Sequence, residues 1–301
     1  MKIYAPDYYK DFRCLASACR HNCCIGWEID IDEQTLAAYD ARRDALGERL
    51  RACIDREDGC AHFRLGEGDR CPFLNGEGLC DIILAAGEEA LCEICTLHPR
   101  YRHFLSTRTE LGLGLSCEAV AALLTQREEP VRMTVIDEDD AEEEPNETER
   151  VLLETRDALI ALAEERSVPL SEREAAILKA VHASALPPAC SYAALYRGLE
   201  RLDAAWETRL DLLSHASDAP DGYADVAGEQ LLVYFLLRHI PRADSEETLI
   251  ATVRFAVHAS RVIRAIAHEG GESIAEVARL YSSEIEYSEE NTEALIWELY
   301  E

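Results

Sequence analysis

Cysteines are the residues of this sequence best placed to do chemistry. Nine of the twelve lie in four short clusters within the first 117 residues. The clusters read C-x4-C-x3-C-C, C-P-F-L-x5-C, C-x2-C and L-S-C-E. Thiols this close in sequence can reach one ion from a single turn or helix face. The spacing therefore predicts metal ligation by Cys14, Cys19, Cys23, Cys24, Cys71, Cys80, Cys92, Cys95 and Cys117.

Thiolates are soft ligands that favour zinc or iron–sulfur clusters. A structural zinc or a four-iron cluster takes four thiolates, so nine thiols exceed one site. Two sites, or one site with further thiols around it, both fit this number. The alternative is that the thiols are free and pack as small apolar side chains, but packing alone does not require repeated short spacing. We expect that packing role for the cysteines outside the clusters, Cys53, Cys60 and Cys190.

No second cofactor motif accompanies the cysteines. The sequence contains no C-x3-C-x2-C, no P-loop and no G-x-S-x-G elbow. Gly112-Leu113-Gly114 does not complete a G-x-G-x-x-G fingerprint. Neither a nucleotide site nor an S-adenosylmethionine site can be placed from a motif.

Composition limits the class of protein. The 301 residues suffice for one large or two ordinary domains, and 48% of them are hydrophobic. A net charge of −29 argues against nucleic-acid binding, which depends on clustered Lys and Arg. No apolar stretch reaches the roughly 18 residues of a membrane span, and the first residues lack a secretory signal. We therefore expect a cytoplasmic protein with reduced thiols and no membrane partner.

The sequence predicts a mainly α protein in three parts. Residues 1–130 form a cysteine-rich metal-binding or iron–sulfur domain with a few short strands. The alternation of apolar and acidic residues from Trp27 to Asp32 predicts one such strand, and Asp32 is placed to cap a helix that reaches about residue 52. Residues 131–150 are acidic and read as a linker, and residues 151–301 are expected to form an antiparallel helical bundle.

Helix start and stop signals divide the last part. Ser171-x-x-Glu174 has the form of a capping box, and Gly270-Gly271 is a helix stop signal. The expected helices begin near Ser116, before residue 175, and at residues 191, 231, 244, 273 and 288. The helix that begins at residue 191 is expected to reach residue 215.

The cysteine segments also resemble a known family, the flagellin lysine N-methylases. The match covers about residues 4–126 and rests on order and spacing together. Its core also resembles a cysteine-cluster domain that chelates zinc or iron. The matching patterns are Y-x2-F-x-C-x4-C-x3-C-C-x-G-W-x-I-x-I-D in residues 9–32, C-P-F-L-x4-L-C in 71–80, L-C-x2-C-x2-H-P-R in 91–100 and E-L-G-L-G-L-S-C-E in 110–118.

This resemblance implies an enzyme that transfers a methyl group from S-adenosylmethionine to lysine ε-amines of flagellin or another lysine-bearing protein. It also implies an iron–sulfur cluster, most simply 4Fe-4S, rather than zinc. Lysine attacks only when deprotonated, and its ordinary pKa is about 10.4, so a base or a desolvated site is required. The polar residues of the matched segments are more typical of caps, ligand orienters or surface groups than of a base. They are Glu110, Glu118, Asp30, Asp32 and His98.

A second reading belongs to another class. The chain could be a non-catalytic metal- or cluster-binding module for electron transfer, metal handling or structural zinc, with the helical half as a docking surface. Trp27 is more typical of a core residue than of a ligand platform, and Arg100 could pair with a ligand carboxylate or a neighbouring acid. The two readings differ in whether the protein binds a methyl donor.

Overall fold

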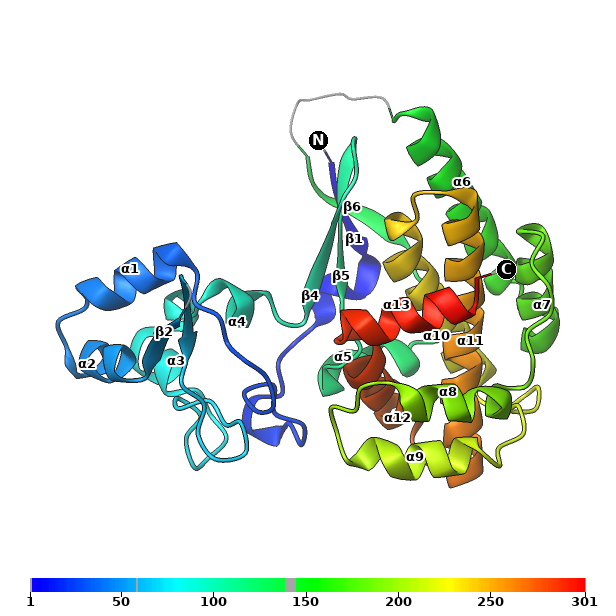
Figure 1. Ribbon diagram of the computed structural model, residues 1–301. Coiled ribbons are helices and arrows are strands. Elements are labelled where there is room, and N and C mark those ends of the chain that lie inside the picture. Colours follow the sequence, from blue (N-terminus) through cyan, green and yellow to red (C-terminus); the bar gives the residue numbers. More distant parts are fainter. Residues whose placement is uncertain (1, 58, 139–144, 301) are drawn as a thin grey trace. The chain divides into compact units, whose positions relative to one another are not determined.

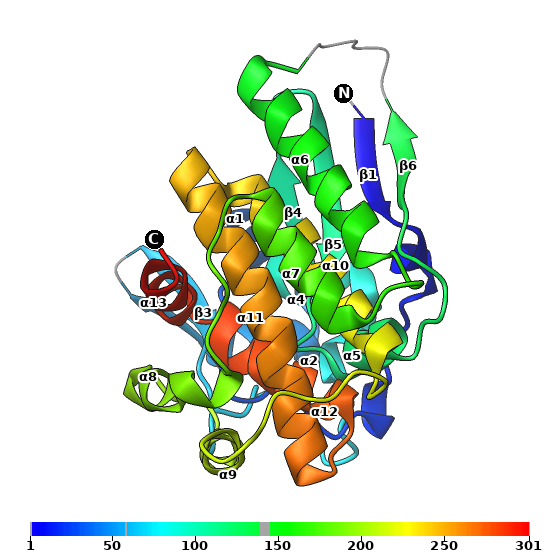
Figure 2. The ribbon, with the colours of Figure 1, turned by 90° about the vertical axis from the view of Figure 1, so that its right-hand side faces the viewer.

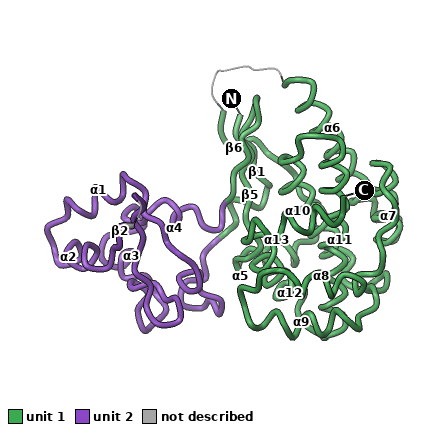
Figure 3. Tube along the Cα trace, viewed as in Figure 1, with its two compact units in different colours: residues 1–12, 101–301 green, residues 13–100 purple. Residues whose placement is uncertain are grey.

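The chain divides into two compact units, each described here by itself (Figure 3). The computed structural model describes residues 2–57, 59–138 and 145–300. Unit 1 comprises Met1–Phe12 and Tyr101–Glu301, and unit 2 comprises Arg13–Arg100. Residues 101–130, expected in the cysteine-rich domain, thus pack with the helical part. The linker expected at 131–150 carries a strand, β6, at Met133–Glu138, while its residues 139–144 lie outside the described residues.

A four-stranded sheet explains this division. Its order is β4 (Arg100–Phe104), β5 (Arg108–Leu113), β1 (Lys2–Pro6) and β6. β1 runs parallel to β5, and β6 is antiparallel to β1. Because backbone bonds join the first strand of the chain to a strand a hundred residues later, both segments belong to one unit. Figure 2 shows β1 and β6 side by side.

Nine α-helices of the described residues complete unit 1, so the chain is mainly helical, as predicted. α10 and α11 form its centre, and every residue of α11 from Ala251 to Ser260 is buried (Figure 1). None of the helices in the described part of the chain is long and apolar enough to cross a bilayer. The nine are α5 (Glu118–Thr125), α6 (Glu147–Ala163), α7 (Leu170–Ala180), α8 (Ala193–Gly198), α9 (Ala205–Leu213), α10 (Asp225–His239), α11 (Glu246–Gly270), α12 (Ile274–Tyr281) and α13 (Glu289–Glu298).

Three of the expected helix starts in this unit are confirmed within a residue or two. Ser273 and Ser288 are the N-caps of α12 and α13, and α11 begins after Ser245 and ends at Gly271, which has a φ of 60°. The helix expected from 191 to 215 is wrong, since it divides into α8 and α9. Ser116 does not cap α5, whose N-cap is Cys117.

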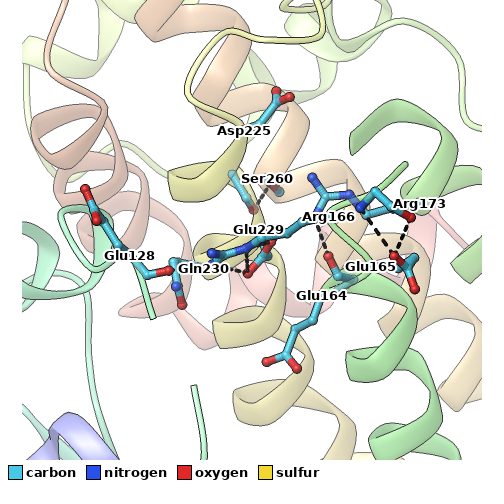
Figure 4. Close-up of polar contacts among 12 residues, drawn as sticks. Glu128, Glu164, Glu165, Arg166, Arg173, Asp225, Glu229, Gln230 and Ser260 are labelled. Atoms are coloured by element: carbon cyan, nitrogen blue, oxygen red, sulfur yellow. Dashed lines mark hydrogen bonds and ion pairs between the residues drawn. The ribbon is translucent and has the colours of Figure 1, made fainter. Parts of the chain in front are cut away.

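Buried charge ties α6 and α7 to α10. Glu229, 1% exposed, accepts hydrogen bonds from the guanidinium groups of Arg166 and Arg173, each with a 2.8 Å contact (Figure 4). Arg166 also donates to the backbone oxygen of Glu128, and Arg173 to that of Ala163. One carboxylate therefore fixes the positions of three segments.

Replacing Gly112 tests how tightly the sheet packs on the helices. A Cβ at this position would lie 2.1 Å from the ring of Tyr101, which is held under the Arg238 guanidinium at 4.7 Å. Because the ring has a neighbour on its other side, we expect Gly112→Ala to lower the free energy of unfolding by about 1–3 kcal/mol. Gly198→Ala, where an added Cβ meets nothing within 4 Å, is the control. Denaturant melts of the two variants should differ, and equal melts would contradict this packing.

Unit 2 combines short elements around a small core. They are α1 (Glu33–Ala41), α2 (Ala45–Ala52), β2 (Ile54–Glu57), β3 (Cys60–Phe63), α3 (Asp81–Ala86) and α4 (Glu93–Leu97). The strand expected from Trp27 is not formed as an element. Its alternation is nevertheless real, because Ile29 and Ile31 are buried and flank a single bridge to His62 in β3. The helix expected to reach residue 52 is interrupted, and Asp44 caps the second piece by accepting from Gly47.

Candidate metal centre

Five of the nine predicted ligands lie in or against one core in unit 2, and a sixth, the exposed Cys23, is hydrogen-bonded to one of them, Cys24. We call Cys23, Cys24, Cys71, Cys80, Cys92 and Cys95 the inner thiols. Cys71 and Cys92 are buried at 7% and 1% exposure, and Cys24, Cys80 and Cys95 pack against the same apolar cluster. Cys24 lies within electrostatic range of Cys71 and Cys80, and Cys95 within range of Cys24 and Cys71. Three of the four clusters thus supply thiols to one region of unit 2.

Backbone hydrogen bonds fix these segments. The N–H of Cys71 donates to the carbonyl of Cys24 at 2.9 Å, which joins the first cluster to the second. Leu74 and Cys80 form a bridge across the turn of the second cluster. Cys80 and Cys92 are the N-cap residues of α3 and α4. The starts of these two helices therefore set where the two thiols lie.

Asp32 connects the cap of one helix to the thiols of another. One carboxylate oxygen accepts from the N–H of Thr35 in α1, and the other accepts from the N–H of Glu93 in α4, both at 2.9 Å. Burial opposes its charge, but these backbone donors lower the pKa of Asp32. The predicted cap is confirmed, and its second bond holds the start of the helix that carries Cys92 and Cys95.

The inner thiols include two hydrogen-bonded pairs. The bond from Cys24, with a smaller contribution from His98, lowers the pKa of Cys23 to about 4, while the same bond raises the pKa of Cys24. The bond with Cys95 likewise lowers the pKa of Cys92, and the pKa of Cys95 is raised. Each pair gives up its first proton easily and its second reluctantly. A metal ion would displace the second proton, since thiolates are the ligands.

Two aromatic side chains frame this cluster. The Trp27 indole donates to the carbonyl of Cys23, and its ring lies 6.0 Å from that of His98. Tyr39, 3% exposed, donates to the carbonyl of Ala90 at 2.7 Å and is within electrostatic range of Cys92, Cys95 and Cys80. Tyr39 is not among the predicted site residues, because a lone aromatic residue in the polar segment of α1 is the only signal that marks it.

The other three predicted ligands are not part of the unit 2 core. Cys14 is exposed, and its sulfur accepts from the N–H of Ala16 at 3.3 Å. Cys19 donates to the carbonyl of His21 in the same loop. Cys117 belongs to unit 1, where it precedes α5 and packs against the core of that unit. Their role as ligands stays a prediction.

The inner thiols lie in one region, but their sulfur atoms do not point at a common metal position. Within the described ranges, no three Cys, His, Asp or Glu side chains stand ready to hold a metal ion as they are. The donor set nevertheless fits a thiolate-bound metal, because five thiols from three of the clusters share one small core and exceed the four that a single metal site needs. Filling such a site requires side-chain rotation within the core.

Two of the acids considered as a base already have structural partners. Glu110, 2% exposed in unit 1, forms a two-bond ion pair with Arg156 at 2.6 and 3.0 Å and a further pair with Arg108. These arginines keep the pKa of Glu110 lowered although burial opposes its charge. Asp32 serves as the cap described above. Neither carboxylate has the freedom that proton abstraction from a substrate requires.

Comparison with known proteins finds distant lysine methylases. The chain is 28% identical over 126 residues to the lysine-N-methylases of Salmonella choleraesuis and Salmonella typhimurium, which is 40% of this chain and 31% of each relative. It is equally similar to the flagellar biosynthetic protein FliU of Salmonella muenchen, with 75% of that protein covered. The match thus spans about a third of the two methylases. No family model and no solved structure matches the chain.

Proposed function

We propose that this protein is an iron–sulfur-dependent protein lysine N-methyltransferase that acts on flagellin with S-adenosylmethionine as methyl donor. The observation that carries the proposal is the gathering of five of the inner thiols on one core, in a chain distantly similar to lysine-N-methylases. The similarity supports the reaction and the kind of target. The thiols support the metal.

The inner thiols would hold the cluster. Cys71 and Cys92 are the most deeply buried of them, and Cys24, Cys80 and Cys95 share their core. Asp32 would keep α4 in place while the cysteines of that segment are engaged. When bound, such a cluster would supply a redox-active centre and join the segments that carry its thiolate ligands. Cys14 and Cys19 lie on an exposed turn, from which they could complete a second site.

The reaction exchanges one bond for another. The lysine nitrogen forms a bond to the methyl carbon with its lone pair, while the bond from that carbon to the sulfonium sulfur breaks and its electron pair stays on sulfur. The products are a methylated lysine, S-adenosylhomocysteine and one proton. The proton must leave the amine before or during attack, because the ordinary lysine pKa of about 10.4 keeps the amine charged near neutral pH. We leave the accepting base unassigned.

The alternative is a module in which the metal only stabilises unit 2. Its favouring observation is the small core of that unit, in which Cys71 and Cys92 are two of only a dozen buried side chains. Small cores commonly need a metal or a disulfide in addition to apolar burial. Zinc would serve this purpose as well as iron.

Metal analysis and methyl transfer separate the two functions. Protein purified without oxygen should contain iron and sulfide, show a visible charge-transfer band, and give an EPR signal after reduction. Given S-adenosylmethionine and flagellin from the same organism, it should raise the mass of flagellin by whole methyl groups. Calorimetry should detect binding of the methyl donor.

The metal content and the methylation result together distinguish the enzyme from the structural module. Zinc alone, with no heat on addition of the methyl donor, would support the structural module and overturn the proposal. A full iron–sulfur complement that binds the donor but leaves every lysine unmodified would retain the cluster and reject flagellin methylation. Heat-treated protein and a flagellin with acetylated lysines are the controls.

A further inference from the structure

The exposed face of α13 carries acidic and aromatic residues in one line. Glu290, Glu293, Trp297 and Tyr300 are all exposed, and their spacing of three, four and three residues places them along one side of the helix and its last turn. We call these four the acidic–aromatic stripe. The opposite side, with Leu295 and Leu299 at 0% and 1% exposure, is buried in unit 1. The helix is the red one in Figure 1.

The two rings of the stripe form an exposed stacked pair. Their centroids are 5.8 Å apart with an interplanar angle of 22°, and Trp297 is 76% exposed. The N–H of Tyr300 donates to the carbonyl of Trp297 at 3.1 Å, which keeps Tyr300 beside the indole. Trp is a highly buried residue on average, so this much exposed indole area marks a surface with something to bind.

The stripe has the electrostatics of a cation site. The faces of Trp and Tyr rings carry negative potential and attract ammonium groups. None of the cation–π contacts among the described residues uses either ring; they lie on Phe73, Tyr4, Tyr8, Tyr101 and Tyr234. Glu293 lies one helical turn, about 6 Å along the axis, before Trp297. A lysine over the rings and another beside the carboxylates would thus be bound together.

We propose that the acidic–aromatic stripe binds a lysine-bearing segment of the partner protein, with one ammonium over Trp297 and Tyr300 and a second against Glu290 and Glu293. This inference rests on the proposed lysine-bearing target and extends it, since it places target docking on unit 1. A net charge of −29 draws basic partners to the surface and increases the association rate. Trp297 follows Glu293 by four residues and Glu290 by seven. A helical partner segment whose lysines repeat at these two spacings therefore matches the stripe.

Binding measurements test this surface independently of catalysis. A fluorescein-labelled helical peptide with lysines at that spacing is titrated into the full, metal-loaded chain, and the same peptide with glutamines is the reference. Trp297→Ala should weaken binding about 2- to 30-fold, as expected for loss of a cation–π contact. Glu293→Lys should weaken it further, and Trp297→Phe should restore part of it.

Phe104→Ala is the matched control, because Phe104 in β4 is also 76% exposed but lies among basic residues. It should leave the affinity unchanged. Equal affinity of the wild type for the lysine and glutamine peptides, or an unaltered Trp297→Ala, would overturn the inference even if flagellin is methylated. Concentration-dependent self-association abolished by Trp297→Ala, without peptide binding, would identify a second copy as the occupant and reject the lysine segment. Loss of methylation with intact peptide binding would count against the proposed function alone.

Discussion

Cys92→Ser is expected to lose the metal and, with it, methyl transfer. Cys92 is the most buried of the inner thiols at 1% exposure, precedes α4 and is hydrogen-bonded to Cys95. Serine keeps the size of the side chain but is a poor ligand for soft metals. Binding of a structural metal by roughly 10–16 kcal/mol, shared among four thiolates, gives about 3 kcal/mol per ligand. We therefore expect metal affinity to fall on the order of 100-fold.

The control for this substitution comes from the same unit. Cys60 is exposed in β3 and outside the four clusters, so Cys60→Ser should keep the full metal content. Iron, zinc and sulfide are measured on both variants after anaerobic purification, and circular dichroism shows whether each is folded. Equal metal content in the two variants would remove Cys92 from the ligand set. A Cys92→Ser variant that loses metal but keeps methyl transfer would separate the metal from the reaction.

Local patterns predicted the thiol cluster because its pieces are short. Asp32 was placed as a cap from its position before a helical segment, and the same carboxylate was found to hold α4. The segment with the pattern C-P-F-L-x5-C forms a turn, which the backbone bridge between Leu74 and Cys80 holds together. The spacing of residues within one cysteine cluster therefore predicts local contacts between residues of that cluster. That three of the clusters supply thiols to one region was expected only on the assumption of a common metal.

Distant partners explain the errors. Residues 101–130 are expected in the cysteine-rich domain, but the pairing of β1 with β5 assigns them to unit 1, and no local pattern predicts that pairing. Helix 191–215 is interrupted because the buried Glu284 accepts the N–H groups of Leu202 and Asp203 at 3.0 and 2.5 Å. A side chain eighty residues away thus takes donors that a helix would otherwise use.

The capping box predicted at Ser171 is not formed because tertiary packing sets the start of α7. α7 begins at Leu170, directly after Pro169, and Leu170 is fully buried. Because burial of Leu170 makes the helix begin earlier in the chain, Ser171 lies inside the first turn. Its hydroxyl donates to Asp221 at 2.8 Å instead of capping the helix. Tertiary packing outweighs a cap worth about 1 kcal/mol.

Glu229→Gln is expected to destabilise unit 1 strongly. Glu229 is 1% exposed and shares its two oxygens between Arg166 and Arg173, and Arg173 is itself only 4% exposed. The amide keeps the volume but removes the charge, so the buried Arg173 guanidinium loses its hydrogen-bonded carboxylate partner. Removing one partner of a buried pair commonly costs about 3–5 kcal/mol, because the remaining charge cannot reach water.

An exposed pair supplies the comparison. Glu154 contacts Arg150 at 2.8 Å on the surface of α6, and the two side chains are 63% and 46% exposed. Glu154→Gln should therefore change the free energy of unfolding by less than about 1 kcal/mol. Urea titrations followed by circular dichroism measure both variants. A similarly small effect of Glu229→Gln would mean that water reaches Arg173 in the variant.

A double substitution identifies the source of the loss. If the cost of Glu229→Gln comes from the stranded Arg173 charge, adding Arg173→Met should recover part of the stability, since an apolar side chain needs no counter-ion. If it comes instead from the lost connection to Arg166, which is 38% exposed and can turn to water, the double variant should be no more stable than the single one. The burial of Arg173 favours recovery, because in this pair of arginines it alone has no route to solvent while remaining bonded to the carbonyl of Ala163.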